Sequence, residues 1–83
     1  MNEVFLMGKV VEDIEYNFII EKGKNAKAIL KLELLDKTRL ELIAYDDVAD
    51  FCFRELIKND MVSINGKITN ENVEIYNIEK FLL

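Results

Sequence analysis

Residues 40–68 read LELIAYDDVADFCFRELIKNDMVSINGKI, and the hydrophobic period changes twice within them. Apolar residues alternate with polar ones up to Ala44, and from Val48 to Leu56 they follow helical spacing. From Met61 the alternation returns. The segment therefore predicts a strand, one helix of about three turns and a second strand.

Polar residues mark both ends of this predicted helix. Asp46 and Asp47 are short acidic side chains that can accept hydrogen bonds from the free N–H groups of a first helical turn. Asn59 readily adopts the left-handed backbone conformation in which many helices end. We therefore expect a helix that begins at the two aspartates and ends at Asn59.

The length and composition are those of one small domain. The chain has 83 residues, of which 51% are hydrophobic, so residues 1–83 can form one domain with its own core. No apolar run approaches the roughly 18 residues that cross a membrane. The N-terminal residues Met-Asn-Glu also lack the basic start of a signal peptide. We expect a cytoplasmic protein with no membrane contact.

The sequence gives little support for catalysis or for a bound metal. It has no histidine and one cysteine, Cys52, which falls on the apolar side of the predicted helix. A buried, inert thiol is the expected state of that residue. Acidic residues show no paired spacing, and no glycine-rich phosphate loop is present. We expect no enzyme activity, no cofactor and no metal site.

The charges are unevenly distributed. The formal net charge is −5, but residues 21–39 contain six basic residues against three acidic ones. A local basic surface attracts phosphate even on an acidic protein, because salt screens distant charges more than near ones. The alternative is that these lysines form only the solvated face of a strand. Composition leaves both interpretations open.

The first half of the chain predicts three extended segments before residue 36. Residues 3–11 are almost continuously apolar, which indicates a strand covered on both faces, and Gly8 suits a bulge or a sharp coil of the strand. Residues 14–20 and 26–35 follow, separated by a loop at 21–25. In the latter strand the even-numbered residues are expected to face the core.

The next connection determines how two strands pair. For Leu30 to share a face with Leu42, paired residue numbers must have an even sum, which a three-residue loop at 36–38 provides. Such a loop needs a residue in the left-handed conformation, usually glycine, and none is present. We expect strain or a longer turn here. In this strand Ile43 is expected to point outward.

The C-terminal part predicts two further strands. Residues 62–68 alternate, with Ile68 expected to point inward, and residues 69–72 form a turn. The last strand, from residue 73 to about 82, loses its alternating phase at Ile78 and Phe81. A bulge or an additional covered surface would explain that change of phase.

The order of strands, with one helix between the third and fourth, predicts an all-β five-stranded OB-fold, a Greek-key barrel. Four segments also resemble the bacterial single-stranded DNA-binding proteins, a family with this fold. They are residues 2–10 (NEVFLMGKV), 13–15 (DIE), 43–50 (IAYDDVAD) and 56–68 (LIKNDMVSINGKI). The resemblance implies a short relative without the family's acidic C-terminal tail. The chain is also similar to the dimeric primosomal replication proteins of the same fold.

The resemblance and the outward positions of the strands suggest nucleic-acid-binding residues. Single-strand binders combine a basic groove with aromatic rings on which bases stack. Phe18 and Tyr45 correspond to family positions where aromatic side chains meet bases, although Phe18 could equally belong to the core or an interface. The candidate phosphate-binding residues are Lys22, Lys24, Lys27, Lys31 and Arg39. Asp46-Asp47 replaces a basic pair of the family.

The resemblance implies a partner as well as a ligand. In the family the first strand pairs with its symmetry mate, which would also cover the second apolar face of residues 3–11. We therefore expect a homodimer, or a tetramer built from it. The interface residues would be Val4, Phe5, Leu6 and Met7.

Two functions remain in competition. The first is non-catalytic, sequence-nonspecific binding of single-stranded DNA in replication, repair or recombination, with other replication proteins as further partners. The second is an OB-fold assembly or adaptor protein that has lost nucleic-acid binding, which the acidic helix and the net charge favour. Salt-sensitive binding to oligo-dT would distinguish them.

Overall fold

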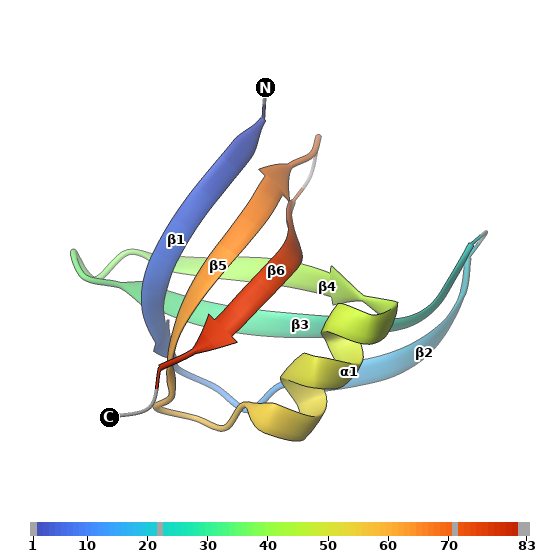
Figure 1. The fold of residues 1–83 in the computed structure, drawn as a ribbon, viewed down its shortest axis with the longest axis horizontal. Helices are drawn as coiled ribbons and strands as arrows, with labels where there is room; N and C mark the ends of the chain where they lie inside the picture. Colours follow the sequence, from blue (N-terminus) through green and yellow to red (C-terminus); the bar gives the residue numbers. More distant parts are fainter. Residues whose placement is uncertain (1, 22, 71, 82–83) are drawn as a thin grey trace.

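The structure is a computed structural model that describes residues 2–21, 23–70 and 72–81 (Figure 1). Six strands and one helix form in these residues. They are β1 (Glu3–Val10), β2 (Glu15–Glu21), β3 (Lys24–Leu34), β4 (Arg39–Tyr45), α1 (Asp46–Glu55), β5 (Met61–Ile68) and β6 (Val73–Lys80).

Five of the strands close a barrel. The sheet order is β1-β5-β6-β4-β3-β2, and an additional pairing of β1 with β3 joins the two ends of the five-stranded part. The β4–β6 pair is parallel, and the other pairs are antiparallel. Helix α1 connects β4 to β5, which are the third and fourth of these five strands in chain order. The predicted OB-fold is therefore confirmed.

Strand β2 is a sixth strand outside the barrel. It pairs with the same edge of β3 as β1 does, at a different part of that strand. Gly8 to Val10 lie opposite residues 34–32 of β3, and Glu15 to Phe18 lie opposite residues 29–26. Residues 11–14 separate the two parts. The β2–β3 hairpin extends away from the barrel beside α1 (Figure 1).

Gly8 allows β1 to cross β3 closely. Of the bulge or sharp coil expected at Gly8, the bulge is wrong, because the pairing of β1 with β5 runs without a shift from Glu3 to Lys9. A Cβ atom at position 8 would instead collide with the carbonyl oxygen of Glu33. The absence of a side chain therefore permits the contact that closes the barrel.

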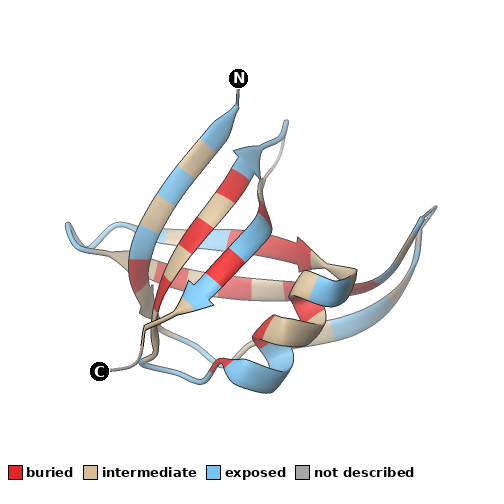
Figure 2. Cartoon of the chain, in the orientation of Figure 1, coloured by how far each residue is buried: buried red, intermediate tan, exposed pale blue. Residues whose placement is uncertain are grey.

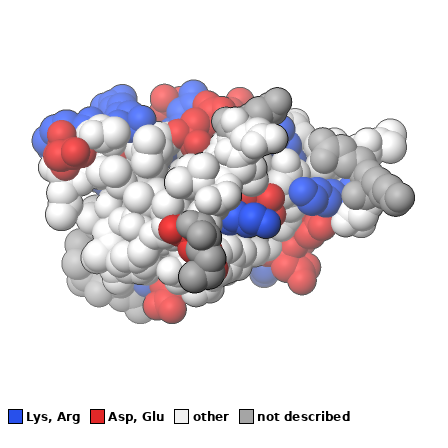
Figure 3. Space-filling view, turned by 90° about the horizontal axis from the view of Figure 1, so that it is seen from above, with Lys and Arg blue, Asp and Glu red and all other residues white. Residues whose placement is uncertain are grey.

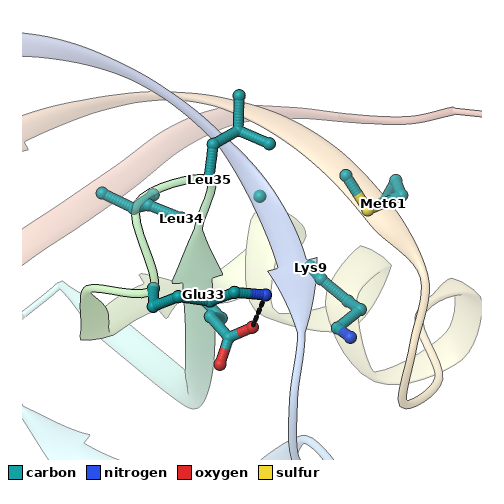
Figure 4. A pocket seen from close by; sticks show the side chains of 7 residues that line it. Lys9, Glu33, Leu34, Leu35 and Met61 are labelled. Carbon is teal, nitrogen blue, oxygen red and sulfur yellow. Dashed lines mark ion pairs between the residues drawn. The ribbon is translucent and has the colours of Figure 1, made fainter.

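A shallow depression lies where β1 crosses β3. The carboxylate of Glu33, at its border, forms ion pairs with two basic side chains. Its Oε2 atom lies 3.1 Å from Nε of Arg39, and its Oε1 atom lies 3.9 Å from Nζ of Lys37. Both basic side chains are thus oriented toward a carboxylate. Figure 4 shows Lys9, Glu33, Leu34, Leu35 and Met61 around this depression.

The core lies inside the barrel and under the helix (Figure 2). The even-numbered residues of β3 from Ala26 to Leu32 are buried, as predicted. Two residues differ from the prediction in their exposure. Ile43 lies on the expected face of β4, opposite Ile29 of β3, but is buried at 5% exposure, and Ile68 is 46% exposed at the end of β5. The largest fully buried side chains are Leu30, Leu32, Leu42, Ile64, Ile75, Val10, Val62 and Cys52.

The turn between β3 and β4 confirms the predicted register and the predicted strain. Leu30 lies opposite Leu42, so the two strands share their inner face. Lys37 adopts φ = 73°, a left-handed conformation that side-chain-bearing residues rarely adopt. The N–H of Lys37 donates to the carbonyl oxygen of Leu34 at 3.0 Å, which holds the turn in that conformation.

Helix α1 is shorter than the sequence predicts. It ends at Glu55, with Leu56 as the capping residue, and not at Asn59. Asn59 does adopt the left-handed conformation, with φ = 82°, but in the turn that precedes β5. Its N–H donates to the carbonyl oxygen of Val10 at 2.7 Å, so this turn is fastened to the end of β1.

The predicted irregularity in the last strand is a β-bulge. Asn65 of β5 lies opposite Asn77, but the next residue, Gly66, lies opposite Ile75. One residue of β6 is therefore unpaired, and the phase of the strand changes there. Ile75 and Ile78 both become buried as a result.

Candidate nucleic-acid interface

Three of the predicted nucleic-acid-binding residues lie together at the base of the β2–β3 hairpin. Lys27 of β3 is the direct cross-strand neighbour of Tyr45 of β4, so both side chains leave the same face of the sheet. The Nζ atom of Lys24 lies 3.8 Å from the centre of the Tyr45 ring. This is the geometry of a cation–π contact. We call Lys24, Lys27 and Tyr45 the basic hairpin site.

Asp46 does not cap the helix as predicted. The N-cap position is Tyr45, and no side chain makes a cap hydrogen bond. The Oδ1 atom of Asp46 instead accepts the backbone N–H groups of Asn25 at 2.8 Å and Ala26 at 3.1 Å. The carboxylate thus links the first residue of α1 to β3, beside the basic hairpin site, and its negative charge is partly compensated by two N–H dipoles.

Lys31 and Arg39 are not part of this site. Lys31 lies four residues along β3 from Lys27, about 13 Å away, and its ammonium group is 3.4 Å from Glu12. Arg39 is paired with Glu33. Exposed ion pairs of this kind are weak, so either cation can exchange partners, but each has a carboxylate beside it. The basic residues that the sequence places in one hairpin are therefore divided between two locations.

Phe18 is not brought together with Tyr45. Phe18 lies opposite Ala26 of β3, whereas Tyr45 lies opposite Lys27, and neighbouring residues of a strand point to opposite faces. The Phe18 side chain is 83% exposed. Its ring makes an edge contact with Tyr16 at 5.6 Å between centroids, on the side of the hairpin that faces the helix.

The remaining predicted site residues add little to the geometry of this interface. Lys22 lies outside the described residues, and the adjacent Gly23 adopts φ = 78° at the hairpin tip. The face of the molecule drawn in Figure 3 shows a broad uncharged area in the middle, with acidic and basic side chains around it. Positive charge is therefore local on this face and does not cover it.

The residues predicted for the dimer interface form the open half of β1. Strand β1 pairs with β3 only from Gly8 to Val10, so within the described residues the stretch 3–7 has β5 as its one neighbour. Phe5 is 61% and Met7 44% exposed. Leu6 packs against the core, and Val4 is half-buried. The outer side of this strand thus presents two apolar side chains beside a free edge.

Cys52 is a buried thiol, as predicted. It is inaccessible to solvent, and this burial raises the pKa of the Cys52 thiol to about 11. A thiol in this state is a poor nucleophile at neutral pH. Residues 2–21, 23–70 and 72–81 bring no group of three potential metal ligands together, and no helix in these ranges is long and apolar enough to cross a membrane.

The sequence interpretation missed two aromatic residues that the structure places close together. The rings of Tyr16 and Phe53 lie 4.8 Å apart, and the Tyr16 hydroxyl donates to the carboxylate of Asp50. This hydrogen bond raises the pKa of the Tyr16 hydroxyl. Asp50 and Phe53 are three residues apart and so share one helix face, which was a signal available in the sequence.

Solved structures similar to this chain are single-stranded DNA-binding proteins. The wild-type single-stranded DNA binding protein from Thermus aquaticus superposes with a TM-score of 0.87 at 26% identity, and a deletion mutant of it with 0.86 at 28%. The chain is covered completely, but it spans only 41% and 42% of those chains. The corresponding domain of a Synechococcus protein gives 0.82 at 20% identity, with 95% of this chain and 94% of that chain covered.

The fold and these similarities define the class of the protein. No family model and no curated protein sequence matches the chain. The solved structures nevertheless confirm the resemblance drawn from residues 2–10, 13–15, 43–50 and 56–68. The chain has the OB-fold, and it is similar in structure to single-stranded DNA-binding proteins.

Proposed function

We propose that the protein binds single-stranded DNA without sequence specificity and without catalysis, in the cytoplasm, during replication, repair or recombination. The observation that supports this most directly is the basic hairpin site, where two lysines flank the partly exposed ring of Tyr45. An aromatic ring can stack on any base, and ammonium groups neutralise the backbone phosphates on either side. Neither contact depends on base identity.

Lys24 has a particular part in this proposal. In the free protein its ammonium group lies over the Tyr45 ring, where a base would stack. Binding therefore requires the lysine to move from the ring to a neighbouring phosphate. The exchange costs little, because an exposed cation–π contact contributes only about 0.5–1 kcal/mol.

The test is a titration of labelled oligo-dT at low and moderate salt, with two charge-reversal variants. We expect Lys27→Glu to weaken binding and to reduce the slope of log K against log salt concentration by about 0.7 or more, the value for one phosphate contact on a single strand. Lys67→Glu on β5 changes the net charge equally but lies outside the basic hairpin site. It should leave the slope near that of the wild type.

Two results would contradict the DNA-binding proposal. The first is no binding of oligo-dT at low salt with excess protein. The second is equal weakening by both variants, since that would report total charge and not a site. The ion pairs of Lys31 with Glu12 and of Arg39 with Glu33 favour the adaptor function in that case, because these cations are already matched by carboxylates.

We further propose that two copies associate through the open edge of β1. Phe5 and Met7 are the exposed apolar residues of this strand, and residues 3–7 leave one row of backbone groups without a described partner. A second copy of the strand would pair with that row and cover both side chains. A tetramer would need a further surface, and other replication proteins are additional candidate partners.

A further inference from the structure

A second aromatic surface lies on the opposite side of the β2–β3 hairpin from the basic hairpin site. Tyr16 is at its centre, in contact with Phe18 of the same strand and with Phe53 of the helix. Phe53 is 56% exposed, and Ile20, near the end of β2, is fully exposed. We call Tyr16, Phe18, Ile20 and Phe53 the aromatic docking face.

This surface adjoins an open strand edge. β2 is the last strand in the sheet order, and in the described part of the chain its backbone bonds only to β3. The middle of the strand, YNFII, contains no charged residue. Edge strands in soluble proteins usually carry charges or bulges that prevent pairing with another chain. The register of β2 against β3 shifts between Phe18 and Glu21, so the regular, uncharged part of this edge is residues 16–18. This part lies beside the exposed rings and is suited to receive another strand.

The charges next to the aromatic docking face are mainly negative. Helix α1 contains four carboxylates and one guanidinium group, and its first turn holds Asp46 and Asp47. Asp50 lies at the face itself, where it accepts the Tyr16 hydroxyl. These carboxylates repel the phosphates of nucleic acid, and they also disfavour a second copy of a chain with net charge −5. They attract lysine and arginine.

We propose that the aromatic docking face and the free edge of β2 bind an extended segment of another protein that carries apolar and basic residues at every second position, so that both kinds lie on one face of the segment. The segment adds a strand to β2 through backbone hydrogen bonds. Its apolar side chains pack on Phe18 and Phe53, and its cationic side chains approach Asp50. This site is separate from the basic hairpin site, so the proposal does not depend on DNA binding.

The probe is an acetylated, amidated heptapeptide, Thr-Val-Thr-Lys-Thr-Val-Thr, which presents valine and lysine on one face of a strand, and its control is the same peptide with glutamate in place of lysine. Both are titrated into the ¹⁵N-labelled protein at low salt. We expect the lysine peptide to shift the backbone amide signals of β2 and of the residues around Phe53, with little change in β5 and β6. The glutamate peptide should produce no saturable shift.

Two serine variants test the role of the exposed ring. Phe53→Ser removes a side chain that is 56% exposed, so the fold should tolerate it, and it should weaken the lysine peptide at least about tenfold. Leu35→Ser is the matched control, because Leu35 is 85% exposed and lies in the β3–β4 turn, away from the aromatic docking face. Its affinity for the peptide should equal that of the wild type.

Three outcomes would overturn the proposal. One is equal binding, or no binding, of the lysine and glutamate peptides. Another is a shift of the Phe18 and Phe53 signals by oligo-dT but not by the peptide, which would assign this face to nucleic acid. The third is concentration-dependent broadening of the same signals without any ligand, which would assign it to a second copy. Loss of oligo-dT binding with retained peptide binding would reject only the proposed DNA function.

Discussion

Asp46 shows how a single side chain can have a different role from the one its sequence position indicates. An aspartate before a helical pattern predicts a cap, because short acidic side chains usually bind the free N–H groups of the first turn. Here the backbone of Asp46 adopts φ = 51°, which directs its carboxylate toward β3. The strained conformation is stabilised by the two N–H groups that it binds, of Asn25 and Ala26.

Replacement of Asp46 should therefore loosen the hairpin. Asp46→Ala removes both hydrogen bonds and leaves, in a left-handed conformation, a residue that tolerates it less well than aspartate, so we expect a loss of about 1–3 kcal/mol in urea unfolding. Asp46→Gly removes the bonds without that strain and should lose less. Asp46→Asn keeps an acceptor oxygen and should lose least.

Amide hydrogen exchange provides the direct readout of the same variants. Exchange at Asn25 and Ala26 should accelerate in Asp46→Ala and Asp46→Gly. The exchange rates of the β5 and β6 amides should change only as much as the loss of global stability predicts. If Asp46→Ala were as stable as the wild type, the carboxylate would not be what fastens α1 to β3.

The turn between α1 and β5 depends on a second aspartate. Oδ2 of Asp60 accepts the backbone N–H of Ile57 at 2.8 Å and lies 3.2 Å from Nζ of Lys80 on β6. The N–H of Ile57, assisted by the Lys80 ammonium group, holds the pKa of Asp60 below its ordinary value of 3.8. Because the folded state favours the ionised form, this residue stabilises the fold above pH about 3.8 and loses that effect as pH falls through its folded pKa.

Asp60→Asn should reveal this pH dependence. We expect the variant to be less stable than the wild type at pH 7, and the difference to shrink as pH falls below 3.8 and the wild-type carboxyl becomes protonated. Urea unfolding at pH 7 and at a series of acidic pH values measures it. Glu79→Gln on β6 is the control, since Glu79 is exposed and should affect stability little at any of these pH values. A difference that stays constant with pH would mean that charge is not involved.

At the scale of the whole molecule, the open edge of β1 determines the mass that we expect for the protein in solution. Light scattering at roughly tens of micromolar protein should give twice the chain mass, because an interface that covers exposed Phe5 and Met7 removes apolar area from water. Phe5→Lys should give the mass of one chain. Phe18→Lys, on a different strand and equally charged, should leave the mass unchanged. A single-chain mass for the wild type would exclude the proposed dimer.

The barrel could be predicted from sequence because strand alternation, the helical segment and the order of elements all indicate the same fold. Tertiary contacts explain what could not be predicted. The sequence does not show why position 8 is glycine, because its close contact is with Glu33, a residue distant in sequence. Alternation places Ile43 on the face opposite Leu42, but it does not show that this face is covered there as well.

The candidate site was predictable only in part, for a related reason. Alternation correctly placed Lys27 and Tyr45 on one face, since both lie on adjacent regular strands. It could not separate Phe18 from Tyr45, because the register of β2 against β3 is set by the hairpin. It also could not show that Lys31 and Arg39 have carboxylates beside them, since Glu12 and Glu33 come from other parts of the fold.

The closure of the barrel by β1 also has a consequence for the order of folding. Glu3 pairs with Lys67, so the first strand obtains its longest ladder only from residues that are synthesised much later. Contacts so distant in sequence form slowly, because a long loop must be closed before they contribute. Until β5 has been made, the apolar stretch EVFLMGKV lacks its main partner, and a newly made chain is most prone to aggregation during that interval.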